Sequence, residues 1–276
     1  MLIGWNGETL PALELEEEIA TVARAGYAGI ELFIPKLRDY LQVHTAIDLH
    51  RLLTGAGLGP LSMNGIENIN LRSPLEFAEV QEECRWLAEV SQIVGCPTIV
   101  AVPSLLPGDI GWPRVRDNTV AALSVLADIA RPYGVKVAFE FLAPANCSVR
   151  TLSQAWDIVE ATRRDSVGIV FDTYHFCVGG SSWESLEEFD VDRLYIVHIN
   201  DVEDLPFEQL TDGHRLLPGE GVLPLETILR HLHERGYSGA CSLEVMRPAY
   251  RQREPSEYAA AGLAATQRLL RQAGAI

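Results

Sequence analysis

Eight short apolar segments, spread along the whole chain, constrain the fold more than any other feature of the sequence. They are rich in Val, Ile, Leu and Phe, and several are apolar at every position. Strands of a parallel sheet have this composition when helices cover the sheet. The predicted strands are residues 2–5, 29–34, 61–64, 98–102, 136–141, 167–171, 194–199 and 242–245.

Segments with helical periodicity separate these strands, at about residues 15–26, 75–93, 117–130, 153–162, 225–234 and 256–273. Alternating strands and helices form either a closed barrel or an open doubly wound sheet. No GxGxxG motif follows the first strand, which disfavours a dinucleotide-binding sheet. The length of 276 residues suits one barrel of roughly 250 residues. We therefore predict an α/β fold, a single (β/α)8 TIM-barrel domain over residues 1–276.

Composition limits the partners of this chain. Its net charge of −16 opposes binding to nucleic acid and to anionic membranes. The N-terminus lacks the basic start and apolar core of a signal peptide, and no apolar run is long enough to span a bilayer. The five cysteines are scattered without a CxxC pair, as expected of reduced thiols. We expect a cytoplasmic protein that binds neither membranes nor nucleic acid, and we leave its oligomeric state open.

Metal-type ligands occur at or near the ends of the last four predicted strands, in otherwise apolar runs. They are Glu140, Asp172, His198 and Glu244. The C-terminal ends of barrel strands face the active site, so these side chains should converge there. Three buried carboxylates would repel one another unless a cation balances them. Three oxygen ligands and one imidazole suit Mn²⁺, Mg²⁺, Co²⁺ or Zn²⁺, and we predict one such ion per chain.

Each of these residues also has an ordinary structural explanation. Asp172 follows a strand and is a candidate helix N-cap. His198 resembles a hydrogen-bonded core histidine, and Glu244 is close enough in sequence to pair with Arg247. The occurrence of all four residues on successive strands favours the metal site over four separate explanations.

Further candidates lie on the first three strands. Trp5 either forms an apolar wall beside sugar carbons or packs in the core, and Asn64 is a candidate for binding a substrate hydroxyl. Glu31 either reaches the rim of the pocket or makes a structural hydrogen bond. The acidic residues at positions 14 and 16–18 are expected to form a solvated helix face.

Several motifs resemble those of the xylose isomerase-like barrels, a family of sugar isomerases, ketose 3-epimerases, inosose-processing enzymes and endonuclease IV. The matching segments are GYAGIEL (26–32), VAFEF (137–141), VGIVFDTYH (167–175), IVHIND (196–201), PGEGV (218–222) and SLEV (242–245). The resemblance spans nearly the whole chain. It implies that Glu140, Asp172, His198 and Glu244 bind one divalent metal, and that His175 and Arg215 contact substrate oxygens.

The resemblance also implies a reaction. In related 3-epimerases two metal-bound glutamates flank the substrate, which gives Glu140 and Glu244 the proton-transfer roles. A metal that binds a ketone oxygen and the neighbouring hydroxyl acidifies the carbon between them and stabilises an enediolate. The segments DVEDLP (201–206) and EVMRPAY (244–250) resemble the inosose-isomerising branch of the family, so the expected substrate is a small polyol or ketose, specifically an inosose.

Other functions of the same fold remain as alternatives. Ketose 3-epimerisation and inosose dehydration use the same metal site. A binding barrel without turnover is a further possibility. The endonuclease branch needs three zinc ions and additional histidines, which seven scattered histidines and the net charge of −16 do not favour.

Overall fold

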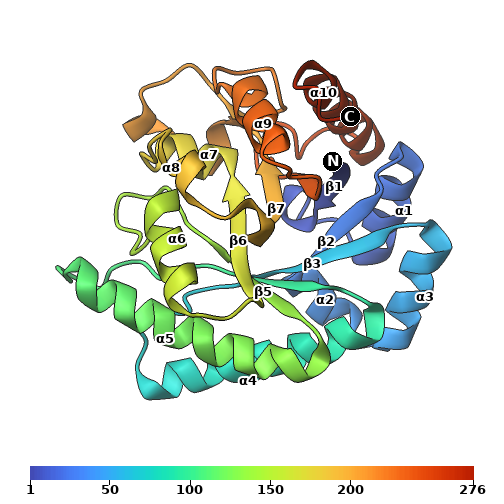
Figure 1. Cartoon of the computed structure of the whole chain (residues 1–276). Helices are drawn as coiled ribbons and strands as arrows, with labels where there is room; N and C mark the ends of the chain where they lie inside the picture. The colour runs from blue at the N-terminus through green and yellow to red at the C-terminus, as the bar shows by residue number, and fades with distance from the viewer.

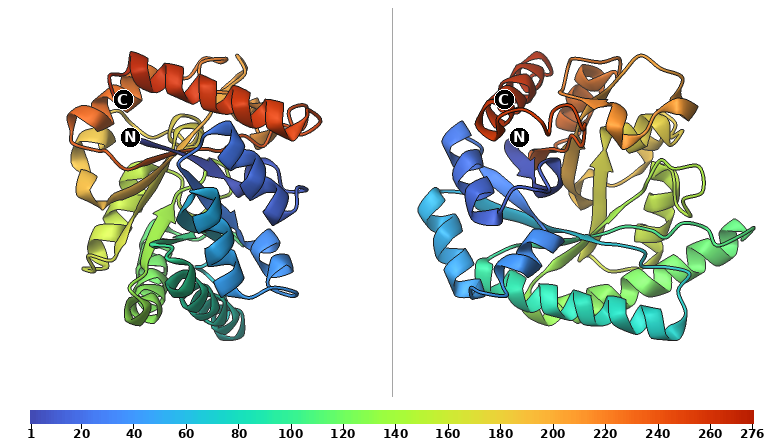
Figure 2. Two further views of the ribbon diagram at one scale, coloured as in Figure 1. Left: turned by 90° about the vertical axis from the view of Figure 1, so that its right-hand side faces the viewer. Right: turned by 180° about the vertical axis from the view of Figure 1, so that it is seen from behind.

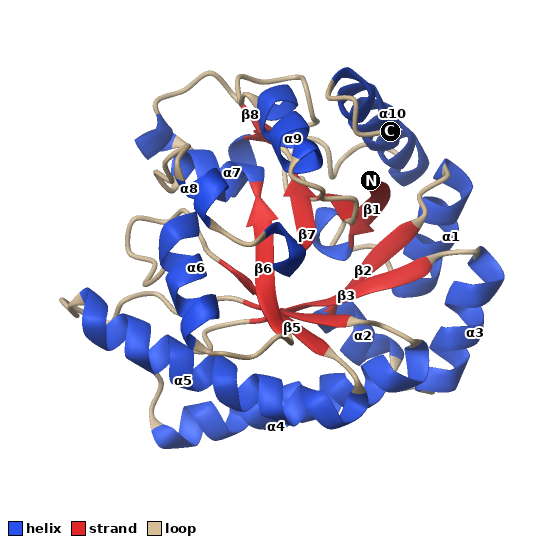
Figure 3. Ribbon diagram, viewed as in Figure 1, coloured by secondary structure: helices blue, strands red, loops and turns tan.

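The computed structural model describes all residues from Met1 to Ile276, and its centre is a closed barrel of eight parallel strands (Figures 1 and 3). Neighbouring strands follow the order β1-β10-β7-β6-β5-β4-β3-β2 around the barrel. The strands are β1 (Leu2–Asn6), β2 (Gly29–Phe33), β3 (Gly59–Ile66), β4 (Thr98–Ala101), β5 (Lys136–Glu140), β6 (Val167–Asp172), β7 (Leu194–Ile199) and β10 (Ala240–Leu243). All eight predicted strands are present, and the predicted (β/α)8 TIM barrel is confirmed.

Helices surround the strands on the outside (Figure 3). They are α1 (Leu15–Ala25), α2 (Ile34–Tyr40), α3 (Ala46–Ala56), α4 (Pro74–Val94), α5 (Trp112–Ala130), α6 (Leu152–Ala161), α7 (Thr173–Val178), α8 (Ser185–Glu188), α9 (Leu225–Glu234) and α10 (Pro255–Gln272). The structure also contains elements that were not predicted from the sequence, namely α2, α3, α7 and the antiparallel pair β8 (Asp201–Val202) and β9 (Arg215–Leu216). None of the helices combines the length and the apolar composition of a membrane span.

Local sequence signals explain where several helices begin and end. Ser73 and Glu76 form a reciprocal capping box at the start of α4, and Thr151 and Gln154 do the same for α6. Helix α1 ends at Gly26, whose φ of 98° lies in the left-handed region that glycine adopts without strain.

The helix α1 buries Leu15, Ile19 and Val22 against the barrel. Its acidic residues divide between two environments, because Glu16 and Glu17 are exposed whereas Glu18 is fully buried. The expectation of a wholly solvated acidic face is therefore wrong at Glu18. Its carboxylate pairs with Lys36 of α2 at 2.9 Å, which is what makes its burial tolerable.

The two ends of the chain meet on one side of the barrel, where α10 packs against α1 and α9 (Figures 1 and 2). The N-terminal amine of Met1 donates a hydrogen bond to the carbonyl of Ala275 at 2.8 Å.

A small apolar layer fills the interior of the barrel. Val100, Ala138, Val170 and Ile196 come from four adjacent strands and are almost completely buried against one another. The polar residues of the site therefore sit on a packed floor at the C-terminal end of the barrel, as in other TIM barrels.

Candidate metal centre

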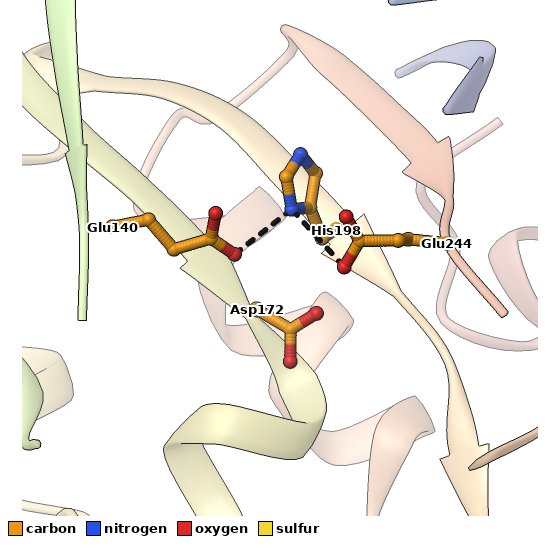
Figure 4. Close-up of side chains that lie close together, drawn as sticks. All are labelled: Glu140, Asp172, His198 and Glu244. Carbon is orange, nitrogen blue, oxygen red and sulfur yellow. Dashed lines mark hydrogen bonds and ion pairs between the residues drawn. The ribbon is translucent and has the colours of Figure 1, made fainter. Parts of the chain in front are cut away.

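Four buried side chains converge at the C-terminal ends of β5, β6, β7 and β10 (Figure 4). They are Glu140, the last residue of β5; Asp172, the last residue of β6; His198 in β7; and Glu244, directly after β10. One ligand atom from each lies within 4.8 Å of the others. This cluster, which we call the metal centre, brings together the four residues predicted from the sequence.

Strand register and alternation explain the convergence. Asp172 of β6 lies opposite His198 of β7, and Ser242 of β10 also lies opposite His198, so neighbouring strands end at the same level. Successive side chains of a strand point to opposite faces. Glu140 points into the barrel, whereas its neighbours Phe139 and Phe141 are buried in the surrounding core.

The imidazole of His198 lies at the middle of this cluster. Its Nδ1 atom is 2.9 Å from Oε1 of Glu140 and 3.5 Å from Oε2 of Glu244 (Figure 4). Burial alone would lower the pKa of His198, but the carboxylates of Glu31, Glu140 and Glu244 raise it well above its usual value. Without a metal, His198 therefore carries a proton that a metal at Nδ1 would have to displace.

Two carboxyl groups of the metal centre, those of Glu244 and Asp172, have pKa values that are shifted in opposite directions. Burial raises the pKa of Glu244 well above its usual value, against the opposing effect of His198 and Arg215. Burial also acts to raise the pKa of Asp172, but the positive charge of Arg215, the strongest opposing neighbour, lowers it to about 2.

Asp172 has two functions that the sequence presented as alternatives. Its Oδ1 atom accepts a hydrogen bond from the backbone N–H of His175 at 2.7 Å and so caps the N-terminus of α7. Its Oδ2 atom accepts from Asn200 at 2.7 Å and lies 3.1 Å from Nη1 of Arg215. One oxygen thus serves the helix and the other belongs to the metal centre.

Arg215 is fully buried and reaches the metal centre from the β8–β9 pair. Its Nη1 atom lies 2.7 Å from Oε2 of Glu244, and its Nη2 atom lies 2.7 Å from Oδ1 of Asp212. The guanidinium also lies over the ring of Tyr174, 4.7 Å from the ring centroid. Arg215 therefore balances the buried carboxylates as well as lining the cavity described below. Glu244 does not pair with Arg247, which instead lies 2.5 Å from Glu203.

His175, which belongs to α7, lies next to Arg215. Its Nδ1 atom accepts a hydrogen bond from the backbone N–H of Ala143 at 3.0 Å, and its Nε2 atom is 3.3 Å from Nη2 of Arg215. Burial lowers the pKa of His175, with Asp172 opposing this shift. A neutral ring that accepts at Nδ1 carries its proton on Nε2. The approach of Nε2 to Arg215 is then a contact between two donors, not a hydrogen bond, and it leaves the Nε2–H available to another acceptor.

A cavity of about 680 Å³ opens above the metal centre. Its wall contains five residues that the sequence suggested for catalysis or substrate binding: Glu140, Glu244, His175, Arg215 and Asn64. Its wall also contains Glu8, Phe33, Ile34, Pro35, Arg38, Asp39, Gly65, Glu67, Glu83, Val102, Leu142, Pro144, Asp212 and Met246.

Trp5 does not line this cavity, so of the two roles considered for it, substrate contact is wrong and core packing is right. Its ring packs edge-on against Tyr27 and Tyr258 in the layer between barrel and helices. Its Nε1 atom donates to Glu18 at 3.0 Å. Trp5 and Asn6 are consecutive in β1, so their side chains point to opposite faces, and it is Asn6 that points toward the site.

Several residues of the cavity wall were not predicted from the sequence. Glu8 follows β1 by two residues, and Arg38 and Asp39 belong to α2. The available signal was position, because segments that follow barrel strands form the active-site face. Glu67 lies in a loop and Asp212 begins a three-residue 3-10 helix (Asp212–His214), and neither segment is long enough for a periodic pattern to distinguish a lining residue from a solvated one.

Comparison with known proteins gives one consistent result. Residues 19–270 match the family model described as xylose isomerase-like TIM barrel. The chain is 37% identical over 250 residues to an inosose isomerase of Halalkalibacterium halodurans, covering 90% of this chain and 89% of that protein. It is 36% identical over 243 residues to an inosose isomerase of Bacillus subtilis, covering 88% and 87%. The solved structure of the IolI protein with a bound zinc atom superimposes with a TM-score of 0.94, at 33% identity and 98% coverage of both chains.

Proposed function

This chain belongs to the xylose isomerase-like TIM barrel family, and on that basis we propose that it is a divalent-metal-dependent isomerase that moves the carbonyl of an inosose to the adjacent carbon. The observation that carries the proposal is the convergence of Glu140, Asp172, His198 and Glu244 at the mouth of the barrel. The similarity to inosose isomerases over most of the chain supports the choice of substrate.

Glu140, Asp172, His198 and Glu244 would hold the metal. Three carboxylates and one imidazole suit Zn²⁺, Mn²⁺, Co²⁺ and Mg²⁺, and the set contains no thiolate. Zinc is the first ion to test because the IolI structure holds it. A divalent ion bound here supplies Lewis-acid polarisation of the substrate carbonyl and its neighbouring hydroxyl.

Glu140 and Glu244 would transfer the protons of the reaction. They flank His198 from opposite sides (Figure 4). One carboxylate removes the proton from the hydroxyl-bearing carbon next to the ketone and produces an enediolate. The other returns a proton to the former carbonyl carbon. The hydroxyl proton of the first carbon passes to the former carbonyl oxygen, so the ketone moves by one position with no net gain or loss of protons. The Nε2–H of His175 faces the same cavity and can donate to a substrate oxygen.

The charge of the cavity favours a neutral polyol. Glu8, Glu67 and Asp39 add carboxylates to those of the metal centre. The two arginines of the wall are already paired, Arg38 with Glu83 and Arg215 with several acids. Carboxylates accept hydrogen bonds from hydroxyl groups, whereas a phosphate or carboxylate on the substrate would meet these like charges with no unpaired arginine in the wall to bind it. A rigid cyclic ketone also loses little conformational entropy on binding.

We further propose that the protein works in the cytoplasm. All five cysteines are unpaired. Burial raises the pKa values of Cys84, Cys96 and Cys241 to about 12, so these thiols are protonated and inert.

The test is incubation of the zinc- or manganese-loaded enzyme with 2-keto-myo-inositol, followed by NMR identification of the products. The proposal predicts a second keto-inositol with the carbonyl on the adjacent carbon. A dehydrated product would instead make the enzyme a dehydratase. Inertness toward the inosose together with epimerisation of fructose, tagatose or psicose would make it a ketose 3-epimerase.

A further inference from the structure

Glu31 is a buried carboxylate beside the metal centre that the proposed reaction does not use. It lies on β2, has no solvent exposure, and is not among the residues that line the cavity. Its Oε1 atom is 3.1 Å from Nε2 of His198, and its Oε2 atom accepts from Oγ of Ser62 at 2.6 Å. Burying an ionised carboxylate this deeply costs folding free energy unless charged or hydrogen-bonding partners compensate for the lost water.

The ring of His198 lies between two sets of carboxylates. Nδ1 faces the metal centre, at 2.9 Å from Glu140, whereas Nε2 faces Glu31. An ionised carboxylate only accepts hydrogen bonds, so the Nε2 atom carries the hydrogen in this contact. A metal-binding histidine usually donates its second N–H to such a group, which fixes both the tautomer and the orientation of the ring.

Asn6 contacts both Glu31 and a second member of the metal centre, Glu244. Its Nδ2 atom lies 2.8 Å from Oε1 of Glu244 and 3.4 Å from Oε1 of Glu31. Asn6, Glu31 and Ser62 come from β1, β2 and β3, which contribute no member of the metal centre. One side of the barrel thus supplies the ligand-type residues, and the other side holds two of them in place.

We propose that Glu31 is a positioning residue of the metal centre, which accepts the Nε2–H of His198 and thereby makes Nδ1 the metal-binding atom. This inference rests on the proposed metal site and goes beyond it. It gives a role to the glutamate of the GYAGIEL segment, which lies on β2, two strands around the barrel from β10 and Glu244. The adjacent negative charge also makes the imidazole a stronger electron donor.

The experiment compares the wild-type protein with Glu31→Gln and with Glu18→Gln as a matched control. Glu18 is also a fully buried glutamate, but it pairs with Lys36 and Trp5 away from the metal centre. Zinc affinity is measured by competition with a chelator. The tautomer of His198 is measured by NMR of the zinc-loaded protein labelled with ¹⁵N-histidine.

The wild-type spectrum should show zinc at Nδ1 and a strongly hydrogen-bonded proton on Nε2. Glu31→Gln should weaken zinc affinity by about 10- to 100-fold, the usual effect of losing such a partner, and should shift the Nε2–H resonance upfield. Glu18→Gln should lower thermal stability and leave zinc affinity unchanged. This contrast separates a positioning role from a general contribution to the fold.

Zinc coordinated through Nε2 in the wild-type protein would overturn the inference, and this readout decides the matter even if Glu31→Gln fails to fold. A folded Glu31→Gln variant with wild-type zinc affinity would also overturn it while leaving the metal site intact. A wild-type protein that takes up no zinc, manganese or cobalt would contradict the metal site itself.

Discussion

The Nη1 atom of Arg215 lies 2.7 Å from Oε2 of Glu244 and so places a permanent positive charge beside a carboxylate of the metal centre. The same atom is 3.1 Å from Asp172. Arg215→Gln should therefore leave two buried carboxylates without their cation. Breaking a buried ion pair from one side costs about 3–5 kcal/mol, and the metal-free protein should lose stability on that scale.

The metal-loaded form of Arg215→Gln should lose much less, because the ion replaces the missing charge. Thermal unfolding with and without zinc measures the difference. Arg38→Gln is the control, since Arg38 pairs with Glu83 at the surface, where such pairs contribute about 0–1 kcal/mol. Equal destabilisation of the loaded and metal-free Arg215→Gln forms would argue against a charge-balancing role.

Metal affinity should rise with pH. The pKa of His198 is raised well above its usual value by three carboxylates, so its contribution to the stability of the metal-free protein is complete below about pH 6.5 and is lost as pH rises through the folded-state pKa. A metal at Nδ1 replaces this proton, and the pKa of Glu244, raised by burial, adds a second competing proton.

The gap in melting temperature between the zinc-loaded and metal-free protein should consequently widen between about pH 6 and about pH 9. Calorimetric titration in buffers with different ionisation enthalpies should also detect proton release on zinc binding. A constant gap together with no released proton would mean that the metal does not displace protons from these residues.

Glu140→Gln and Glu244→Gln should separate proton transfer from metal binding. Each amide keeps an oxygen that can still coordinate, but neither can move a proton at neutral pH. The turnover number should fall by about 10²-fold or more, the usual scale for a positioned acid or base. Metal content is measured on the same samples. Wild-type turnover in a metal-loaded variant would remove that glutamate from the reaction.

Trp5→Phe should affect stability and leave catalysis unchanged. The substitution removes the indole N–H that donates to the buried Glu18 at 3.0 Å. The same oxygen of Glu18 keeps its ion pair with Lys36, so the cost is that of one hydrogen bond to a charged group, roughly 1.5–3 kcal/mol, to be measured by denaturant unfolding. The Michaelis constant for the inosose should stay at the wild-type value, because Trp5 is separated from the cavity by the barrel wall. A raised Michaelis constant with unchanged stability would restore Trp5 to the substrate site.

The metal centre could be predicted from sequence because its residues are exceptional where they stand. Glu140, His198 and Glu244 interrupt apolar runs in which an unpaired charge is costly, and parallel strands bring their ends together. The barrel was predictable for the same reason, since strands such as β6 are buried at every position.

Side-chain direction was not predictable on the first strands. Trp5 and Asn6 are both buried, and the sequence does not show which of them points into the barrel. The roles of Glu18 and Glu31 depend on partners distant in the sequence, Lys36 and His198, so local periodicity could not reveal them. The helix α2 is short and begins with Ile34-Pro35 directly after a strand, so its sequence shows no helical periodicity. Neither the helix nor the cavity wall that it forms could therefore be predicted.

The most direct test of the account is incorporation of deuterium from D2O into 2-keto-myo-inositol by the zinc-loaded enzyme, followed by NMR. The account predicts deuterium on a carbon next to the carbonyl, together with a second keto-inositol, and loss of both when a chelator removes the metal. Conversion of the inosose without deuterium incorporation, or at the same rate in the metal-free protein, would contradict metal-dependent proton transfer at Glu140 and Glu244.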